Sequence, residues 1–237
     1  MIDCNCFFGP RSMGRELLNR KDFDTLRASG IREVCVSTTK LGYYDLMEGN
    51  REILELCRGT DFLHPVLTMQ LGMGDIGREG ELLALDAKLY RLYFDTGLPP
   101  RFKDPTLSRF LEGVQKKGGS LIVSYGSDTH GLIEQTASRF SDMPVIVTGI
   151  NYPQIRPALA LFASCSNTYM EISHFSAFNG LEYLARVMGA GRLVFGTNSP
   201  VYAHRSNVLK LRMADLSEEE KERIGERNFL EAVGGLK

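Results

Sequence analysis

The stretch Arg192-Leu193-Val194-Phe195-Gly196-Thr197-Asn198-Ser199-Pro200 joins a short apolar run to a turn of small polar residues. This pattern predicts a buried strand that ends abruptly in a tight turn. In α/β folds built from parallel strands, the side chains at the strand ends carry the chemistry. The side chain at this strand end is Asn198, a neutral amide that cannot act as a general base and is a poor metal ligand.

Seven similar apolar runs precede this one, and each is followed by a stretch with helical character. The expected strands are 1–8, 33–38, 62–68, 89–94, 120–125, 144–148, 168–173 and 193–195. The expected helices are 21–29, 50–58, 81–87, 106–117, 132–140, 154–163, 180–188 and a helical tail from about 207. Continuous apolar strands between helices indicate a parallel sheet that is covered on its faces.

Eight β-α units in 237 residues favour a closed (β/α)8 TIM barrel, one domain over residues 1–237. A doubly wound open sheet is the alternative. Such a sheet usually carries a glycine-rich phosphate loop after its first strand, and Phe8-Gly9-Pro10 does not provide one.

The bulk composition excludes several classes of partner. The net charge of -1 leaves no basic surface for nucleic acid. No apolar run is long enough to cross a membrane. The five cysteines are an odd number, which is typical of a reducing compartment, so we expect a cytoplasmic protein. The surface helices of a barrel leave a homo-oligomer possible.

Cys4 and Cys6 form a C-x-C pair in the first expected strand, but no second cluster of cysteine and histidine completes a metal site. Strict alternation places both thiols on the face opposite Asp3 and Asn5. We therefore expect both cysteines to pack as small apolar side chains beneath the helices.

Alternation counted back from each strand end predicts which side chains face the barrel interior near its mouth. The predicted set is Asp3, Asn5, Phe7, Arg91, Tyr93, Asp95, Ser124, Gly149, Glu171, Ser173 and Asn198. Of the four histidines, His174 is the one placed to titrate near this set. His64 is expected to be packed in a strand, and His130 and His204 are expected to face solvent.

Arg91 is the most informative residue of the set, because a guanidinium inside a barrel must be paired or must bind an anion. One interpretation is a structural pair with Asp3 or Glu171. The other is a fork that holds the carboxylate of a substrate. Asp3 and Glu171 could serve as acid and base if their surroundings separate their pKa values.

At these strand ends the sequence resembles the amidohydrolase superfamily. Its amidohydrolase-related barrels open with I-D-x-H-x-H and carry G-[ST]-D-x-P after the eighth strand. Here the matching stretches are Ile2-Asp3-Cys4-Asn5-Cys6-Phe7 and Gly196-Thr197-Asn198-Ser199-Pro200. The tail from Leu216 to Asn228 also resembles the final helix of that family. The resemblance implies the barrel fold along the whole chain.

The resemblance also implies one or two divalent metals, held by histidines of strands one, five and six and by the aspartate after strand eight. The matching positions in this sequence are Asn5, Phe7, Ser124, Gly149 and Asn198. Catalytic zinc needs about three strong protein ligands, which this set lacks. We therefore expect a divergent branch with no tightly bound transition metal and no cofactor.

Three functions remain open from the sequence. The first is a metal-free protein, a pseudoenzyme, that binds a small polar or carboxylate-bearing molecule through Asn5, Arg91, Ser124 and Tyr93. The second is a metal-independent hydrolase or lyase acting on an amide, lactone or carboxylate. Its catalytic residues would be Asp3, Glu171, His174 and Asn198, the amide stabilising an oxyanion. The third is a scaffold without a ligand.

Overall fold

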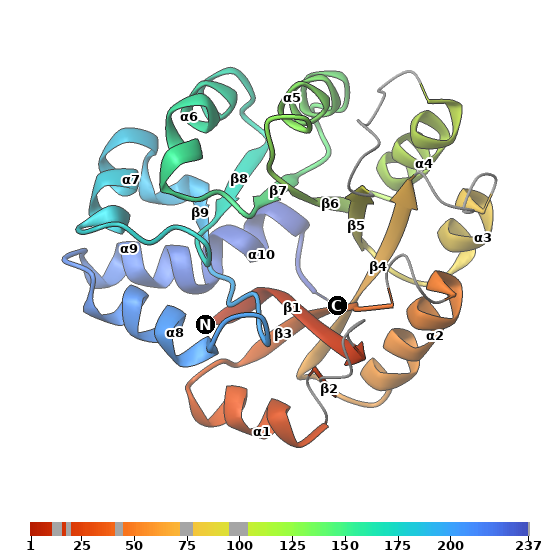
Figure 1. Ribbon diagram of the computed structural model, residues 1–237, viewed down its shortest axis with the longest axis horizontal. Coiled ribbons are helices and arrows are strands. Elements are labelled where there is room, and N and C mark those ends of the chain that lie inside the picture. Colours follow the sequence, from red (N-terminus) through yellow and green to blue (C-terminus); the bar gives the residue numbers. More distant parts are fainter. Residues whose placement is uncertain (11–15, 18–19, 41–44, 72–77, 95–103, 237) are drawn as a thin grey trace.

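The computed structural model describes residues 1–10, 16–17, 20–40, 45–71, 78–94 and 104–236. The predicted barrel is confirmed: eight parallel strands in the described part lie side by side, and helices connect them on the outside (Figure 1). In order, the strands are β1 (Ile2–Pro10), β3 (Glu33–Thr38), β4 (Leu63–Leu71), β5 (Leu89–Phe94), β6 (Ser120–Ser124), β7 (Val145–Thr148), β8 (Thr168–Glu171) and β9 (Leu193–Val194).

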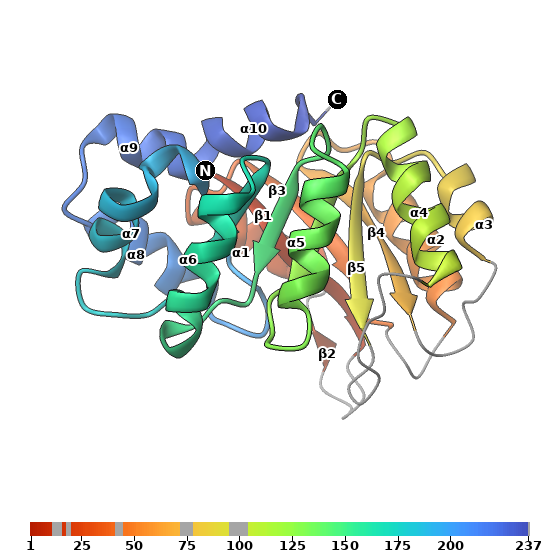
Figure 2. The same cartoon turned by 90° about the horizontal axis from the view of Figure 1, so that it is seen from above.

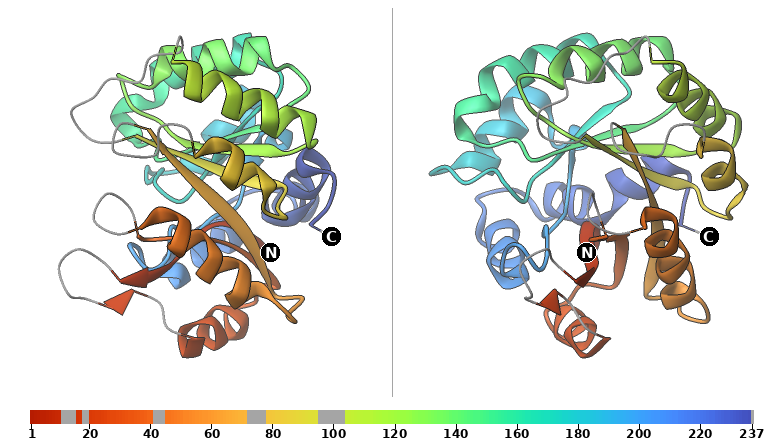
Figure 3. Two further views of the ribbon diagram at one scale, coloured as in Figure 1. Left: turned by 90° about the vertical axis from the view of Figure 1, so that its right-hand side faces the viewer. Right: turned by 45° about the vertical axis from the view of Figure 1, so that its right-hand side comes forward.

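The barrel closes where β9 returns to β1. The backbone N–H of Cys4 donates to the carbonyl of Phe195 at 3.1 Å, and that of Phe7 donates to Ser199 at 2.9 Å. Figure 3 shows the ring of strands from two further directions. A short antiparallel strand of two residues, β2 (Glu16–Leu17), pairs with the end of β1 and was not predicted.

Ten α-helices within the described ranges pack around the strands or across one end of the barrel (Figure 2). They are α1 (Arg20–Ala28), α2 (Leu46–Cys57), α3 (Glu79–Ala84), α4 (Pro105–Lys116), α5 (His130–Arg139), α6 (Ile155–Ser164), α7 (Gly180–Met188), α8 (His204–Met213), α9 (Glu218–Glu222) and α10 (Asn228–Val233). Short helical segments lie at Tyr152–Gln154 (η1), Ala190–Arg192 (η2) and Arg223–Arg227 (η3, a π-helical turn). None of the described helices is both long and apolar enough to span a bilayer.

Two apolar layers hold the barrel together. The outer layer lies between strands and helices and includes Val36, Tyr90 and Leu121. The inner layer takes one side chain from most strands and is closed at the amino-terminal end of the barrel by α10. Its members are Ile2, Cys4, Cys35, Val66, Leu89, Ile122, Ile146, Val194, Phe229 and Val233. This plug makes the lower interior of the barrel a packed core, so a polar site inside the barrel must lie toward the carboxyl ends of the strands.

A β-bulge in β1 corrects one expectation from the sequence. The pairing of β1 with β3 shifts between Asp3 and Cys6, because a bulge adds an unpaired residue to one strand. Cys4 therefore belongs to the inner layer, whereas Cys6 packs in the outer layer. The prediction that both thiols lie beneath the helices fails for Cys4, since strict alternation does not hold across a bulge.

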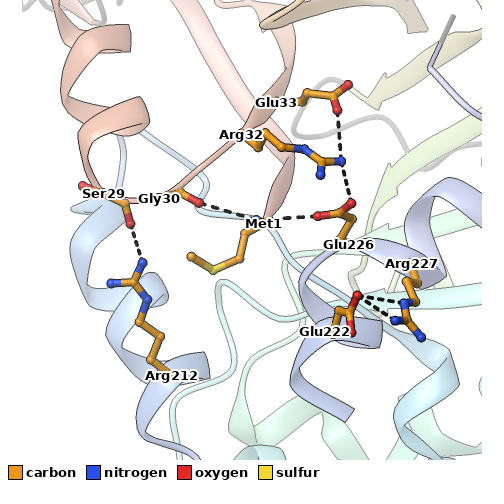
Figure 4. Close-up of polar contacts among 9 residues, drawn as sticks. All are labelled: Met1, Ser29, Gly30, Arg32, Glu33, Arg212, Glu222, Glu226 and Arg227. Atoms are coloured by element: carbon orange, nitrogen blue, oxygen red, sulfur yellow. Dashed lines mark hydrogen bonds and ion pairs between the residues drawn. The ribbon is translucent and has the colours of Figure 1, made fainter. Parts of the chain in front are cut away.

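The amino-terminal end of the barrel, called the floor below, carries ion pairs around its apolar plug (Figure 4). Arg32 pairs with Glu226, and the amino group of Met1 lies 3.9 Å from the same carboxylate. The side chain of Arg32 is 59% exposed, so solvent reaches this cluster. Its charges serve as a reference for those buried at the opposite end.

Candidate functional site

A layer of polar side chains lies directly above the apolar inner layer, toward the carboxyl ends of the strands, called the mouth below. In three neighbouring strands, Ser37, Thr68 and Arg91 follow the inner-layer residues Cys35, Val66 and Leu89 by two positions. Because side chains two apart on a strand share a face, these polar groups also point into the barrel. All three are buried.

Arg91 lies at the centre of this layer, only 3% exposed. Its Nε donates to Ser37 Oγ at 2.9 Å, and its Nη2 donates to Asn5 Oδ1 at 2.9 Å. The ring of Phe7 lies over the guanidinium, 4.6 Å from its carbon. Burial lowers the pKa of Arg91 to about 10, which leaves it charged at neutral pH. Within the described ranges Arg91 forms no ion pair with Asp3 or Glu171, so the predicted structural pair is not made.

Glu171 lies next to this cation but is separated from it by the amide of Asn5. Asn5 Nδ2 donates to Glu171 Oε2 at 2.9 Å, and the Ser173 hydroxyl donates to the same oxygen at 2.8 Å. The backbone N–H of Ser173 donates to Oε1. The carboxyl is fully buried, and burial raises its pKa despite these donors.

Gly196 makes room for that carboxyl. A Cβ at this position would lie 2.5 Å from Glu171 Oε1 and 2.7 Å from its carboxyl carbon. Any side chain at residue 196 would therefore displace Glu171. The glycine that ends the last apolar run in the sequence thus leaves space for the buried carboxyl of Glu171.

The network continues from Glu171 to the rim of the barrel. Ser173 Oγ lies 3.2 Å from His174 Nδ1, and His174 Nε2 lies 3.5 Å from the amide nitrogen of Asn198. An amide N–H donating to Nε2 leaves the proton of the neutral ring on Nδ1, from which it can bond Ser173 Oγ. Burial, followed by the charge of Lys210, lowers the pKa of His174 and so favours that neutral ring.

Asn198 itself has a φ of +51°, in the left-handed region that asparagine tolerates better than most residues. It is 7% exposed, and the ring of Tyr202 packs against its neighbour His174 with centroids 4.9 Å apart. The turn after β9 therefore holds a neutral amide against an imidazole at the entrance of the barrel.

Asp3 has a different position from the one expected. Its carboxylate accepts from the backbone N–H of Thr197 at 2.9 Å and of Asn5 at 3.0 Å, and also from the Thr197 hydroxyl. Burial is the largest influence and raises the pKa of Asp3 to about 7. Asp3 thus closes the seam between β1 and the turn after β9, and no hydrogen bond among the described residues joins it to Glu171.

The remaining predicted residues lie farther from this network. Ser124 is exposed at the end of β6, with its hydroxyl 3.3 Å from that of Thr148. Tyr93 is half-buried at the end of β5. Gly149 adopts a φ of +81° just after β7. Asp95 lies outside the described residues. The predicted residues that the structure joins are therefore Asn5, Phe7, Arg91, Glu171, Ser173, His174 and Asn198.

Sequence reasoning missed several residues of the site, and two of them bond directly to the network. Ser37 supports Arg91 from β3, although the same alternation rule could have found it. Lys210 of α8 donates to the carbonyls of Ile172, Ser173 and Phe175 at 2.7, 3.2 and 3.1 Å. Burial lowers the pKa of Lys210 to about 8. A lysine on a helix after the last strand carries no local signal for such a role.

The donor set does not fit a divalent metal centre of the kind that the family implies. No group of three or more His, Cys, Asp or Glu side chains within the described ranges is arranged to hold a metal. The oxygen of Asn5 already accepts from the Arg91 cation. A second cation bound there would be repelled by the guanidinium. Phe7 offers no donor atom, and its ring covers Arg91.

Comparisons with known proteins agree with this geometry at the level of family and fold. A family profile described as amidohydrolase matches residues 85–231. A putative 2-pyrone-4,6-dicarboxylic acid hydrolase from Pseudomonas putida superposes with a TM-score of 0.76 at 15% identity, covering 98% of this chain and 97% of that one. A 2,6-dihydroxybenzoate decarboxylase from Rhizobium gives 0.70 at 14% identity, with 98% of both chains covered.

An uncharacterised TIM-barrel protein from Bordetella bronchiseptica is similar over 99% of this chain and 100% of its own, with a TM-score of 0.73 and 16% identity. Structural likeness at these identities shows a shared barrel. A comparison with curated protein sequences finds no match. The profile covers more than half of the sequence, and on that basis the chain belongs to the amidohydrolase family.

Proposed function

We propose that the mouth of this barrel binds a small polar molecule bearing a carboxylate, without a tightly bound transition metal. The observation that carries the proposal is the guanidinium of Arg91, which is buried and has no carboxylate partner among the described residues. Its Nε and Nη2 donate to neutral groups, and its Nη1 makes no hydrogen bond within the same ranges. A buried cation with a free donor is a ready partner for an anion.

Thr68 supports this proposal from the neighbouring strand. Thr68 and Arg91 are directly paired in register between β4 and β5. The Thr68 hydroxyl is fully buried and has no hydrogen-bond partner in the described part of the chain. A buried hydroxyl normally finds a partner. A carboxylate that approaches Arg91 Nη1 would supply one.

The names of two structural relatives agree with this chemistry. The Pseudomonas protein is named for a dicarboxylic acid and the Rhizobium enzyme for a benzoate. Both compounds carry carboxylates on a planar ring. We extend this class of ligand to the present chain as part of the proposal.

The proposal is tested by thermal shift and calorimetry with benzoate, phthalate and citrate as probes. We expect at least one probe to raise the melting temperature of the unmodified protein and of Arg51→Met, which removes an exposed arginine on α2. Arg91→Met should lose the shift, with affinity reduced by about 10- to 100-fold, because a charge-assisted hydrogen bond contributes roughly 1.5–3 kcal/mol. Arg91→Lys keeps the charge and controls for folding. Undiminished binding by Arg91→Met would disprove the role of this residue.

Independence from metal is tested separately. We expect the purified protein to contain zinc, manganese and nickel well below one equivalent. Binding of the same probes should be unchanged after dialysis against EDTA. Stoichiometric metal that is lost together with binding would contradict the proposal.

The hydrogen-bonded series from Glu171 to Asn198 favours a second candidate function, a metal-independent hydrolase or lyase. A neutral His174 held by Ser173 is suited to accept a proton, and the Asn198 amide could stabilise an oxyanion. The test is turnover of simple lactones, amides and aryl carboxylates by the unmodified protein. His174→Gln and Glu171→Gln should each reduce turnover by at least about 100-fold. Turnover that survives both substitutions would eliminate these residues as acid and base.

A further inference from the structure

Helix α8 contacts both turns that form the site, although it contributes no residue to the interior of the barrel. Asn207 is buried, and its amide nitrogen donates to the carbonyl of Thr197 at 3.1 Å, directly before Asn198. Lys210 lies one helical turn later, on the same side of α8. Its ammonium reaches the other turn, between β8 and α7, which carries His174.

The contacts of Lys210 are specific. An ammonium group has three N–H donors, and Nζ has three carbonyl acceptors here: Ile172, Ser173 and Phe175. These three carbonyls belong to one turn and all accept from the same nitrogen. A surface lysine instead keeps its head in water. The ammonium of Lys210 is therefore solvated by backbone oxygens of the residues that flank His174, in place of water.

We propose that Asn207 and Lys210 are positioning residues, which together hold Asn198 and His174 within hydrogen-bond reach of each other. Asn207 anchors the turn after β9, and Lys210 anchors the turn after β8. Because both side chains come from one rigid helix, they set the distance between the two turns. This inference deepens the proposed function, on which its biological purpose rests, but the arrangement itself can be tested without any ligand.

The charge of Lys210 adds an electrostatic effect to the positioning. The groups that contact the imidazole of His174 are Ser173, Asn198 and Tyr202. Lys210 acts on it through its charge, and Glu171 is linked to it through the Ser173 hydroxyl. A positive charge disfavours the imidazolium, so Lys210 lowers the pKa of His174. It also opposes the rise that burial causes in the pKa of Glu171.

The experiment is an NMR titration of the full chain without ligand, which reports the pKa of His174, its ring tautomer and the amide shifts of residues 172–175 and 197–198. Lys210→Met keeps most of the apolar stem but removes the charge and the donors. We expect it to raise the pKa of His174, to shift the amides of residues 172–175 and to mix the two ring tautomers. Arg205→Met, which removes an exposed charge from the same helix, should leave all three readouts as in the unmodified protein.

Two further variants separate charge from geometry. Lys210→Arg keeps the charge but presents a planar fork, so it should restore the pKa of His174 while the amides of residues 172–175 remain shifted. Asn207→Ala should shift residues 197–198 and mix the tautomers, with little change in the charge near His174. A Lys210→Met variant whose titration, tautomer and amide shifts match those of the unmodified protein would overturn the inference.

A titration of the unmodified protein provides a test if Lys210→Met does not fold. The amides of residues 172–175 should show an inflection near pH 8, where Lys210 loses its proton. Asp3, whose pKa is about 7, also titrates in this range. Lys210→Arg separates the two groups, because it should keep the transition of Asp3 and lose the one near pH 8. The same inflection in Lys210→Arg would contradict the assignment. If the NMR readouts are as expected but no probe binds, the proposed function fails while this inference stands. If probes bind but Lys210→Met leaves the NMR readouts unchanged, this inference fails while the proposed function stands.

Discussion

The two ends of the barrel hold their charges in opposite ways. At the floor, Arg32 and Glu226 pair directly, and their side chains are 59% and 23% exposed (Figure 4). At the mouth, Arg91 and Glu171 are almost fully buried, and the neutral amide of Asn5 separates them. Solvent screens the first arrangement, whereas the second depends on hydrogen bonds to neutral groups.

This difference indicates which end of the barrel has charged groups that can act on a ligand. In a direct ion pair each charge is balanced by its partner, so little electrostatic attraction remains for a ligand. A buried cation that is bonded to neutral groups keeps its charge unmatched, and a buried acid has its pKa displaced upward. Such perturbed groups are typical of functional sites. The comparison therefore predicts large, salt-insensitive effects at the mouth and small, salt-sensitive effects at the floor.

The largest effect is expected for Asp3→Ala at the seam. This substitution leaves three donors from Thr197 and Asn5 without their acceptor. We expect a loss of about 3 kcal/mol in the free energy of unfolding, since each unpaired buried donor costs roughly 1 kcal/mol or more. Urea unfolding at pH 5 measures this value. A loss below about 1 kcal/mol would show that the seam does not depend on Asp3.

The pH dependence of stability should be almost as large. Burial raises the pKa of Asp3 from 3.8 to about 7 and also raises that of Glu171, so the folded protein binds protons that the unfolded chain releases. The stabilisation from these protons is complete below about pH 4 and is lost as the pH rises through 7.

For Asp3 alone, we expect a decrease in unfolding free energy of about 2–3 kcal/mol between pH 5 and pH 8. Urea unfolding across this range measures it, and Asp3→Asn should flatten the profile. A protein whose stability increases from pH 5 to pH 8 would contradict the assigned direction of the shift.

Gly196→Ala should have the next largest effect, because the added Cβ would overlap the carboxyl of Glu171. We expect a loss of about 2 kcal/mol, typical of overpacking in a core. Gly80→Ala in α3 is the matched control, because a methyl group added there would meet nothing within 4 Å and alanine favours a helix. Thermal unfolding of both variants compares them. Equal stability would mean that Glu171 moves without cost.

The smallest effect is expected at the floor. Arg32→Ala breaks the partly exposed pair with Glu226, and we expect a loss of about 0.5 kcal/mol that disappears in 1 M NaCl. Unfolding in low and high salt measures both values. A loss above about 2 kcal/mol that persists in salt would remove the distinction between the two ends.

The sequence predicted the scaffold well because its strands are uninterrupted apolar runs. Residues 33–38 and 89–94 coincide with β3 and β5. Helix α2 begins four residues earlier than expected, since Asp45 caps it by accepting from Met47 and Glu48 ahead of Gly49 and Asn50. Pro65 lies inside β4 opposite Val36, although proline is uncommon within a sheet.

The site was predictable only where alternation holds. Arg91 and Glu171 follow the two-residue period and lie inside the barrel as predicted. Asp3 does not, because the bulge after it turns Cys4 inward and moves the carboxylate of Asp3 to the seam. The role of Lys210 depends on where α8 packs, which no local pattern specifies.

The bond between Asp3 and Thr197 spans 194 positions of the chain. During synthesis, the first strand leaves the ribosome long before its last partner exists. The edge of β1 that pairs with the segment after β9 therefore lacks this partner through most of translation. An unpaired strand edge can form hydrogen bonds with another chain. Two of the three donors to Asp3 belong to Thr197, so the acid that closes the ring stays incompletely paired until the last strand has been made.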